Sequence, residues 1–169
     1  MDRVEAFNSL PAGKLEAELL AVCAAPAWGR AVAALRPYPS KEAILAAADA
    51  AARSLSWPEV LQGLSAHPRI GERAQGESQE AAWSRREQST AAAGGDDDTR
   101  AALTAANHAY EDRFGHVFLI FASGRTQEEI LAAARERLGN DDATERAIVT
   151  DELRKIALLR LERLLDALD

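Results

Sequence analysis

The chain has 169 residues, of which 47% are hydrophobic and 28% charged, and its net charge is −7. This length suits one domain, and this composition supports a buried core rather than disorder. An acidic chain without a run of about 18 apolar residues is not expected to bind nucleic acid or to span a membrane. Its single cysteine, Cys23, cannot form an internal disulfide, which favours a reducing cytoplasm.

Helical periodicity and breaker residues divide the first half of the chain into three predicted helices. The first covers residues 14–23, and the second begins after Ser40, a favourable N-cap residue. The third begins at Trp57 and runs to about Ser65, with a proline in its tolerated first turn. Residues 66–76 are expected to form a loop.

The second half contains four further predicted helices and one extended segment. The helices are expected over residues 78–93, from the Asp96–Thr99 cap to about Arg113, over 126–138, and from about 142 to about 168. The apolar run 117–122 is too short for a typical helix and is expected to be extended and buried. The sequence therefore predicts an all-α, single-domain bundle of about seven or more helices with one short extended segment, covering residues 1–169.

One charged residue stands within the apolar face of the last predicted helix. At 100° per residue, Arg160 falls in the middle of a sector formed by Val149, Leu153, Ile156, Leu164 and Ala167. A charge in such a place is costly unless it is paired. Two interpretations are open: a structural salt bridge or an arginine that extends past its neighbours, or an arginine held in a pocket to bind a carboxylate.

A compact polar cluster lies on the predicted helix over residues 78–93. Glu87 and Gln88 follow Ser84 by three and four residues and are therefore its neighbours on the helix surface. One interpretation is an ordinary solvent-facing surface. The other is a set of hydrogen-bonding groups and an acid directed into a pocket.

His67 lies in the predicted loop, directly before Pro68. The proline restricts the local backbone and favours an extended conformation at His67. A rigid loop that presents an imidazole suits acid–base chemistry near neutral pH, although a lone loop histidine is more often incidental. No histidine pair with i, i+4 spacing and no partner motif for the cysteine is present, so no metal is expected. No nucleotide-binding glycine motif is present either.

These residues coincide with the pattern of a known family over almost the full chain. The sequence resembles the 2-oxo-4-hydroxy-4-carboxy-5-ureidoimidazoline (OHCU) decarboxylases of uric acid breakdown. The matching blocks are Phe7-Asn8-Ser9-Leu10-Pro11, Cys23-Ala24-Ala25-Pro26-Ala27-Trp28, Arg36-Pro37-Tyr38, His67-Pro68-Arg69-Ile70-Gly71, Ser84-Arg85-Arg86-Glu87-Gln88, Phe114-Gly115-His116-Val117-Phe118-Leu119-Ile120, Gly124-Arg125 and Lys155-Ile156-Ala157-Leu158-Leu159-Arg160-Leu161. The sequence departs from the family pattern at His116-Val117, where many members of the family have residues similar to Phe-Pro.

The resemblance implies an all-α enzyme that needs no cofactor and often forms a homodimer. It implies that His67 and Glu87 are catalytic. The substrate contacts that it implies are Pro68, Ser84, Gln88, Arg160 and the backbone of Phe118, Leu119 and Ile120. The expected reaction is decarboxylation of OHCU to (S)-allantoin. The alternatives are another ureide-processing lyase or hydrolase on the same scaffold, and a non-enzymatic helical interaction module.

Overall fold

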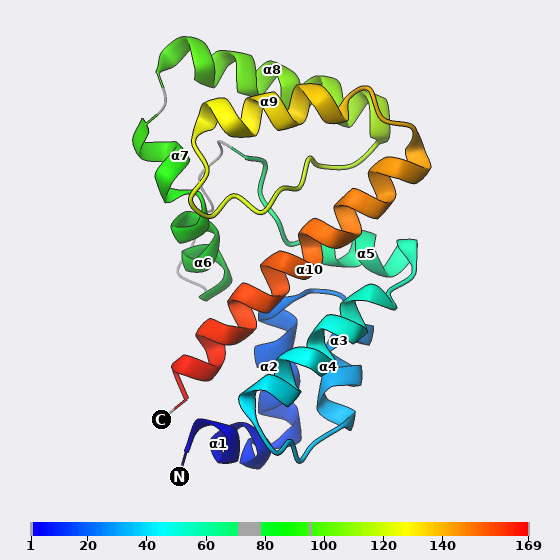
Figure 1. Ribbon diagram of the computed structural model, residues 1–169, viewed down its shortest axis with the longest axis vertical. Helices are drawn as coiled ribbons and strands as arrows, with labels where there is room; N and C mark the ends of the chain where they lie inside the picture. The colour runs from blue at the N-terminus through cyan, green and yellow to red at the C-terminus, as the bar shows by residue number, and fades with distance from the viewer. Residues whose placement is uncertain (1, 71–78, 95, 169) are drawn as a thin grey trace. The chain divides into compact units, whose positions relative to one another are not determined.

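Helices make up all the regular secondary structure that the computed structural model assigns to the residues it describes, 2–70, 79–94 and 96–168. Within these ranges the chain forms α1 (Arg3–Ser9), α2 (Ala12–Val22), α3 (Pro26–Ala34), α4 (Lys41–Arg53), α5 (Trp57–Leu64), α6 (Gln79–Glu87), α7 (Ser89–Gly94), α8 (Asp97–Phe114), α9 (Gln127–Arg137) and α10 (Asp142–Asp166) (Figure 1). The predicted all-α class is confirmed. None of the helices in the described ranges combines the length and apolar composition needed to cross a bilayer.

The first of two compact units comprises Met1–Ala66 and Leu153–Asp169, so it contains α1 to α5 and the C-terminal part of α10. Helix α3 packs against both α2 and α4. The fully buried Trp28 joins α3 to α4, because its indole N–H donates to the Ala48 carbonyl at 3.0 Å. Ser40 caps α4 as predicted, and its hydroxyl accepts from the Ala43 N–H.

Helices α1 and α3 are absent from the sequence-based prediction, although each carries a start signal. Asp2 and Glu5 form a reciprocal capping box at α1, in which each side chain accepts from the other residue's backbone N–H at 3.0 Å or less. Pro26 occupies the first turn of α3, where its missing N–H costs nothing. The prediction treats this proline only as the end of the preceding helix.

The second unit comprises His67–Glu152 and contains α6 to α9 and the first part of α10. Helix α8 packs along α9, and α7 contacts α6 and α9. Gly115 ends α8 with a positive φ of 81°, and Thr126 and Glu129 form the predicted capping box of α9. The core of this unit consists of Ile70, Ala91, Leu103, Ala106, Tyr110, Phe118, Ile120, Ala122, Ile130, Leu131 and Ala134.

The single helix predicted over residues 78–93 is wrong, because the chain forms two helices that are separated at Gln88. The Ser89 hydroxyl donates to the Arg86 carbonyl at 2.8 Å. Such a local side-chain bond competes with the continuing helix ladder for a backbone acceptor. Residue 78, where the prediction starts, lies outside the described residues. The prediction of one domain over residues 1–169 stays a prediction.

Candidate functional site

The segment His67–Ile70 is attached to α8 by two contacts. The Arg69 guanidinium makes a two-pronged ion pair with Glu111, with Nε–Oε1 at 2.7 Å and Nη2–Oε2 at 3.1 Å. The side-chain amide of Asn107 donates to the Ile70 carbonyl at 2.7 Å. The first contact holds the segment by the side chain of Arg69, and the second holds it by the backbone of Ile70. Both the position and the direction of the segment are therefore constrained.

His67 itself is half-buried, as is Pro68. An imidazole in such a place can contact both the protein interior and a small molecule from solvent. The predicted loop is confirmed for the described residues 66–70, none of which belongs to a helix. Gly71 and Glu72, which continue the motif, lie outside the described residues.

The polar cluster on α6 is largely buried. Ser84 is 4% exposed and Glu87 is 6% exposed, while Gln88 is half-buried at the break that follows the helix. The interpretation of an ordinary solvent-facing surface is therefore wrong for Ser84 and Glu87. Buried polar groups need hydrogen-bond partners, so this part of α6 is specified by polar contacts as well as by apolar packing. A role in a ligand pocket remains a prediction.

The segment 117–122 belongs to no helix or strand. Its predicted burial is confirmed for residues 118–120 and 122, while Val117 and Phe121 are half-buried. Phe118, Leu119 and Ile120 are each at most 3% exposed. The backbone groups of such a segment are not consumed by a helix or sheet ladder, so they must find individual partners. This property suits a wall that recognises a ligand through its main chain.

The core of the second unit joins three of the segments that carry predicted site residues. Ile70 follows the His67 motif, Ala91 lies on α7 after the polar cluster, and Phe118 and Ile120 belong to the buried segment; all four pack in one cluster. The loop, the α6–α7 region and the buried segment therefore share a common hydrophobic support.

Arg160 is 1% exposed on α10 and belongs to the first unit. The predicted apolar sector is confirmed for Val149, Leu153, Ile156 and Leu164, which are all buried. Ala167 is exposed, because α10 ends at Asp166. The interpretation of an arginine that extends past its neighbours to reach water is wrong, because the side chain is almost fully buried. A structural salt bridge and a pocket for a carboxylate both stay open, and contact of Arg160 with substrate stays a prediction.

Cys23 lies in the same unit as Arg160, and the positive charge of Arg160 affects the pKa of its thiol. Burial raises the pKa of the Cys23 thiol, while a hydrogen bond from the Ala25 backbone and the positive charge of Arg160 act in the opposite direction. The raised pKa keeps this thiol protonated near neutral pH, which makes it a poor nucleophile.

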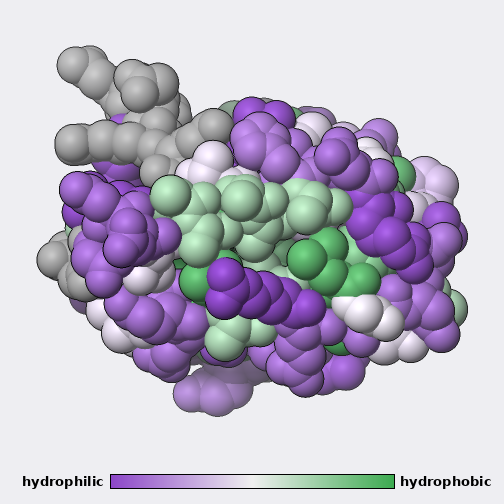
Figure 2. Space-filling view, turned by 90° about the horizontal axis from the view of Figure 1, so that it is seen from above, coloured by the Kyte–Doolittle hydropathy of each residue, from purple (hydrophilic) through white to green (hydrophobic). Residues whose placement is uncertain are grey.

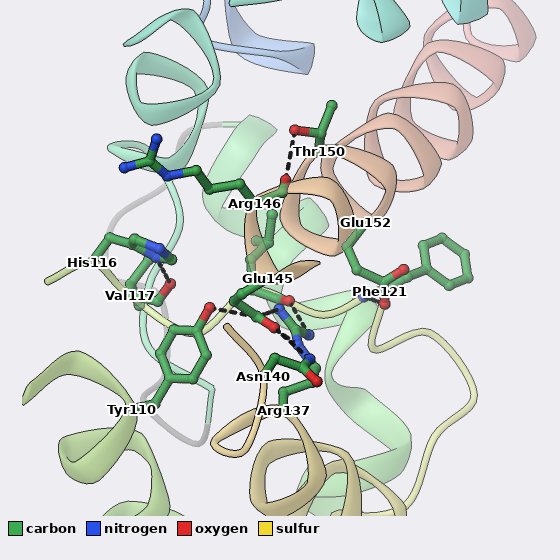
Figure 3. A network of polar contacts seen from close by, with 11 residues as sticks. Tyr110, His116, Val117, Phe121, Arg137, Asn140, Glu145, Arg146, Thr150 and Glu152 are labelled. Atoms are coloured by element: carbon green, nitrogen blue, oxygen red, sulfur yellow. Dashed lines mark hydrogen bonds and ion pairs between the residues drawn. The ribbon is translucent and has the colours of Figure 1, made fainter. Parts of the chain in front are cut away.

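A buried ionic network links α8, α9, α10 and the segment 117–122 (Figure 3). The Glu145 carboxylate accepts from the Tyr110 hydroxyl at 2.6 Å, from Arg137 Nε at 2.8 Å and from Asn140 Nδ2 at 3.1 Å. Arg137 Nη1 also donates to the Leu119 carbonyl at 2.7 Å. The network thus reaches the backbone of the segment that is predicted to bind substrate.

Aromatic rings surround the charged part of this network. The Arg137 guanidinium lies 4.5 Å from the centre of the Phe118 ring and 5.8 Å from that of Tyr110. Burial, followed by the hydrogen bond to Glu145, raises the pKa of the Tyr110 phenol well above its usual range. Tyr110 therefore keeps its proton at neutral pH and can donate the hydrogen bond to Glu145.

Tyr110, Arg137 and Glu145 are not among the predicted site residues, although the sequence contains a signal for Arg137. Ile130, Ala134 and Arg137 are spaced as i, i+4 and i+7, and all three are buried. Arg137 thus ends an apolar stripe, just as Arg160 interrupts one. Its partner Glu145 gives no comparable signal, because its position in the first turn of α10 is equally typical of a solvated acid.

In the part of the chain that the structure describes, no three His, Cys, Asp or Glu side chains gather in a way that could hold a metal ion. The described residues thus define an all-α protein with a half-buried histidine loop, buried polar groups on α6 and a buried irregular segment. The OHCU decarboxylase family model matches residues 8–162. The chain belongs to the OHCU decarboxylase family, as its sequence predicts.

The curated relatives include proteins from a plant, a fish and an archaeon. The chain is 34% identical over 152 residues to the uric acid degradation bifunctional protein TTL of Arabidopsis thaliana, covering 88% of this chain and 47% of that protein. It is 44% identical over 62 residues to the OHCU decarboxylase of Amia calva, covering 37% of this chain and 35% of the relative. The Haloferax volcanii OHCU decarboxylase is 29% identical over 126 residues, covering 75% of this chain and 73% of that enzyme.

Two of the crystal structures that resemble the fold illustrate the similarity. One is an OHCU decarboxylase in the presence of (S)-allantoin, with a TM-score of 0.74 and 32% identity, covering 88% of this chain and 97% of that chain. The other is an (S)-allantoin synthase, with a TM-score of 0.71 and 20% identity, covering 95% of this chain and 53% of that chain. At this identity, the similarity supports the fold alone. The chain spans about half of the Arabidopsis protein and a third of the Amia calva enzyme.

The ion pair that attaches the His67 segment to α8 predicts a pH-dependent contribution to stability. The hydrogen bond from Arg69 lowers the pKa of the Glu111 carboxyl. A lowered pKa stabilises the fold above the ordinary pKa of glutamate, and this gain is lost as the pH falls through the folded-state value. In urea unfolding at pH 7, Glu111→Gln should lower the free energy of unfolding by about 0.5 kcal/mol, because the pair is partly exposed.

At about pH 3 the difference between the two proteins should be smaller than at pH 7, since the Glu111 carboxyl loses its charge as the pH falls through its lowered pKa. Glu128→Gln, at an exposed position on α9, serves as the control for the change in net charge. An equal difference between wild type and Glu111→Gln at both pH values would contradict the assignment.

Proposed function

We propose that this protein is a carboxy-lyase that converts OHCU to (S)-allantoin and carbon dioxide without a cofactor. The observation that carries the proposal is the burial of Ser84 and Glu87 on α6, at the positions where the family resemblance implies substrate binding and catalysis. The names of the relatives support the reaction class. An interaction module would have no need to bury these groups, because every buried polar group has to be matched by a hydrogen-bond partner.

The substrate explains why the reaction needs no added electron acceptor. OHCU carries a carboxylate and a hydroxyl on one ring carbon, next to a C=N bond. When the carbon–carboxylate bond breaks and CO₂ leaves, its electron pair forms a C=C bond to the carbon that bears the ureido group. The electrons of the C=N bond move to the ring nitrogen, which takes up a proton. A proton then adds to the ring carbon that bears the ureido group, and the hydroxyl loses its proton to become a carbonyl. The side of the ring that receives the proton determines whether (S)-allantoin forms.

His67 and Glu87 are the proposed proton-handling residues. A half-buried imidazole can exchange a proton near neutral pH and can accept the hydroxyl proton or deliver one to the ring. Glu87, 6% exposed, would hold the imidazole in its working tautomer or take part in the transfer. The two roles together place proton donation on one side of the substrate.

The proposed substrate contacts combine side chains with main chain. Arg160 would orient the carboxylate, since a guanidinium matches that group with two parallel hydrogen bonds. Too strong a grip would stabilise the substrate more than the transition state, so the carboxylate must remain able to leave. The other proposed contacts are Pro68, Ser84, Gln88 and the backbone of Phe118, Leu119 and Ile120.

The first experiment follows the circular dichroism of allantoin formed in a urate oxidase product mixture. Wild-type protein should accelerate the appearance of the (S)-allantoin signal. His67→Ala should remain folded yet give racemic allantoin at the uncatalysed rate, because OHCU also decays on its own. This corresponds to a loss of at least 100-fold, the usual contribution of a positioned acid or base.

His108→Ala is the matched control. His108 lies exposed on α8, so its removal should leave rate and stereoselectivity unchanged. Full stereoselective activity in His67→Ala would overturn the catalytic assignment. A wild-type protein without effect on the mixture would overturn the proposed reaction and favour another ureide-processing enzyme or an interaction module.

Arg160→Met distinguishes the two interpretations of the buried arginine. If Arg160 binds substrate, the variant should fold and its KM should rise at least tenfold, or turnover should cease, because one charged hydrogen-bonded contact contributes about 1.5–3 kcal/mol. Thermal unfolding monitored by circular dichroism reports the fold, and steady-state kinetics report KM. Arg163→Met, on the same helix, controls for the loss of an arginine. Severe unfolding of Arg160→Met alone, with normal KM in the folded fraction, would identify a structural salt bridge.

We further propose that the protein is a cytoplasmic homodimer. A hydrophobic band between hydrophilic residues, visible in Figure 2, supports self-association. Ala101, Ala105 and Ala109 are exposed one turn apart on α8 and would permit close helix packing. Light scattering should give the mass of two chains for wild type and of one chain for Ala105→Glu. A single-chain mass for wild type would contradict the dimer.

The lone buried Cys23 suits a reducing compartment, so the protein should be found in the cytosolic fraction of disrupted cells.

A further inference from the structure

The backbone on both sides of Ile120 is held by two buried charged side chains. Before it, the Leu119 carbonyl accepts from Arg137 Nη1 at 2.7 Å. After it, the Phe121 N–H donates to Glu152 Oε1 at 3.3 Å (Figure 3). Arg137 and Glu152 are each 6% exposed. Two consecutive peptide groups therefore have their directions set from outside the segment.

Peptide planarity determines what these two bonds do to Ile120. In a trans peptide the C=O and N–H groups point in opposite directions. The one cis bond among the described residues is Arg36-Pro37, so both peptide groups of Ile120 are trans. The Ile120 N–H therefore points away from Arg137, and the Ile120 carbonyl points away from Glu152. One residue thus presents a donor and an acceptor, each directed away from its anchor.

A donor and an acceptor on one residue match the chemistry of an amide. Each N–H of an amide can donate and its carbonyl can accept, so a ureido group or the amide of a five-membered ring can form two hydrogen bonds with such a pair. Main-chain recognition of this kind requires groups whose direction is set before the ligand arrives. Preorganisation avoids the entropic cost of ordering the segment during binding.

Arg137 is itself held rigidly enough to serve as an anchor. Its Nε donates to Glu145 at 2.8 Å, and Nη2 contacts the same carboxylate. Tyr110 and Asn140 donate to that carboxylate as well, and the Phe118 ring lies against the guanidinium. A planar guanidinium with this many contacts has one orientation, which a flexible lysine ammonium would not reproduce.

We propose that Arg137 and Glu152 are positioning residues that aim the N–H and carbonyl of Ile120 at an amide of the substrate, its ureido group or its ring amide. This inference rests on the proposed function, since it names how that site recognises its substrate. Neither residue touches the reacting atoms. Their removal should therefore weaken substrate binding while leaving the chemical step nearly unchanged.

The main test replaces the buried pair by apolar side chains of similar size, Arg137→Met with Glu145→Met. Such a replacement leaves no unpaired charge in the core, and buried ion pairs replaced in this way often leave proteins folded. The KM for OHCU should rise about tenfold, because this is the upper end of the effect expected when one ordinary hydrogen bond to the substrate is lost. The kcat should change less than about threefold, because the lost contact binds the substrate and the transition state equally well.

Tyr110→Phe is the matched control, since it removes a hydrogen bond to Glu145 at 2.6 Å but keeps the ring and the bond from Arg137 to Leu119. It should lower the thermal midpoint and leave KM unchanged. If the double variant fails to fold, Arg137→Lys carries the same comparison, because it keeps a charge in the core but loses the planar fork. Equal KM values in the control and the Arg137 variants would show a structural role only and overturn the proposal.

Nuclear magnetic resonance of protein labelled with ¹⁵N-isoleucine gives an independent readout with (S)-allantoin as the probe. In wild type the Ile120 amide resonance should shift on titration, and in the double variant this shift should be lost at the same ligand concentration. An unshifted Ile120 amide in a wild-type protein that decarboxylates OHCU would overturn this inference and leave the proposed function intact. A wild-type protein without decarboxylase activity would instead overturn the proposed function.

Discussion

Arg137 and Glu145 contact each other inside the second unit with 6% and 0% of their surfaces exposed. Removing two charges from water costs several kcal/mol for each ion, and only close pairing and further hydrogen bonds offset that cost. Here those bonds come from Tyr110 on α8, from Asn140 and from the Leu119 carbonyl. The pair therefore holds three helices and the segment 117–122 together, and loss of one partner would cost about 3–5 kcal/mol through the charge left behind.

The proposed chemistry makes modest demands on such a frame. The substrate brings its own electron acceptor, so the protein has to bind a small polar ring, keep water away and place a proton on one side. Buried Ser84 and Glu87, the half-buried His67 and the main chain at Ile120 are suited to these tasks. Hydrogen-bonding groups whose directions are set before binding act more strongly in a site from which water is excluded.

Local sequence rules predicted those parts of the fold that depend on neighbouring residues. The caps at Ser40 and Thr126 form as expected, and the apolar face of α10 is buried around Arg160. The break at Gln88 was missed, because helix periodicity continues through it. Candidate site residues came from a resemblance combined with charges out of place on apolar faces. The pairing of Arg137 with a partner on the next helix could not be predicted, since it depends on how α9 and α10 pack rather than on local sequence.

The central claim is that the residues named by the family pattern surround one small ligand. A crystal structure of this protein with (S)-allantoin bound tests it most directly. The account predicts a ligand within hydrogen-bond distance of His67 and of the α6 polar cluster, with its amide groups on the main chain of Ile120 and with Arg160 at its edge. A ligand bound away from His67 and Glu87, or His67 and Arg160 each facing separate parts of the protein with the ligand in place, would contradict it.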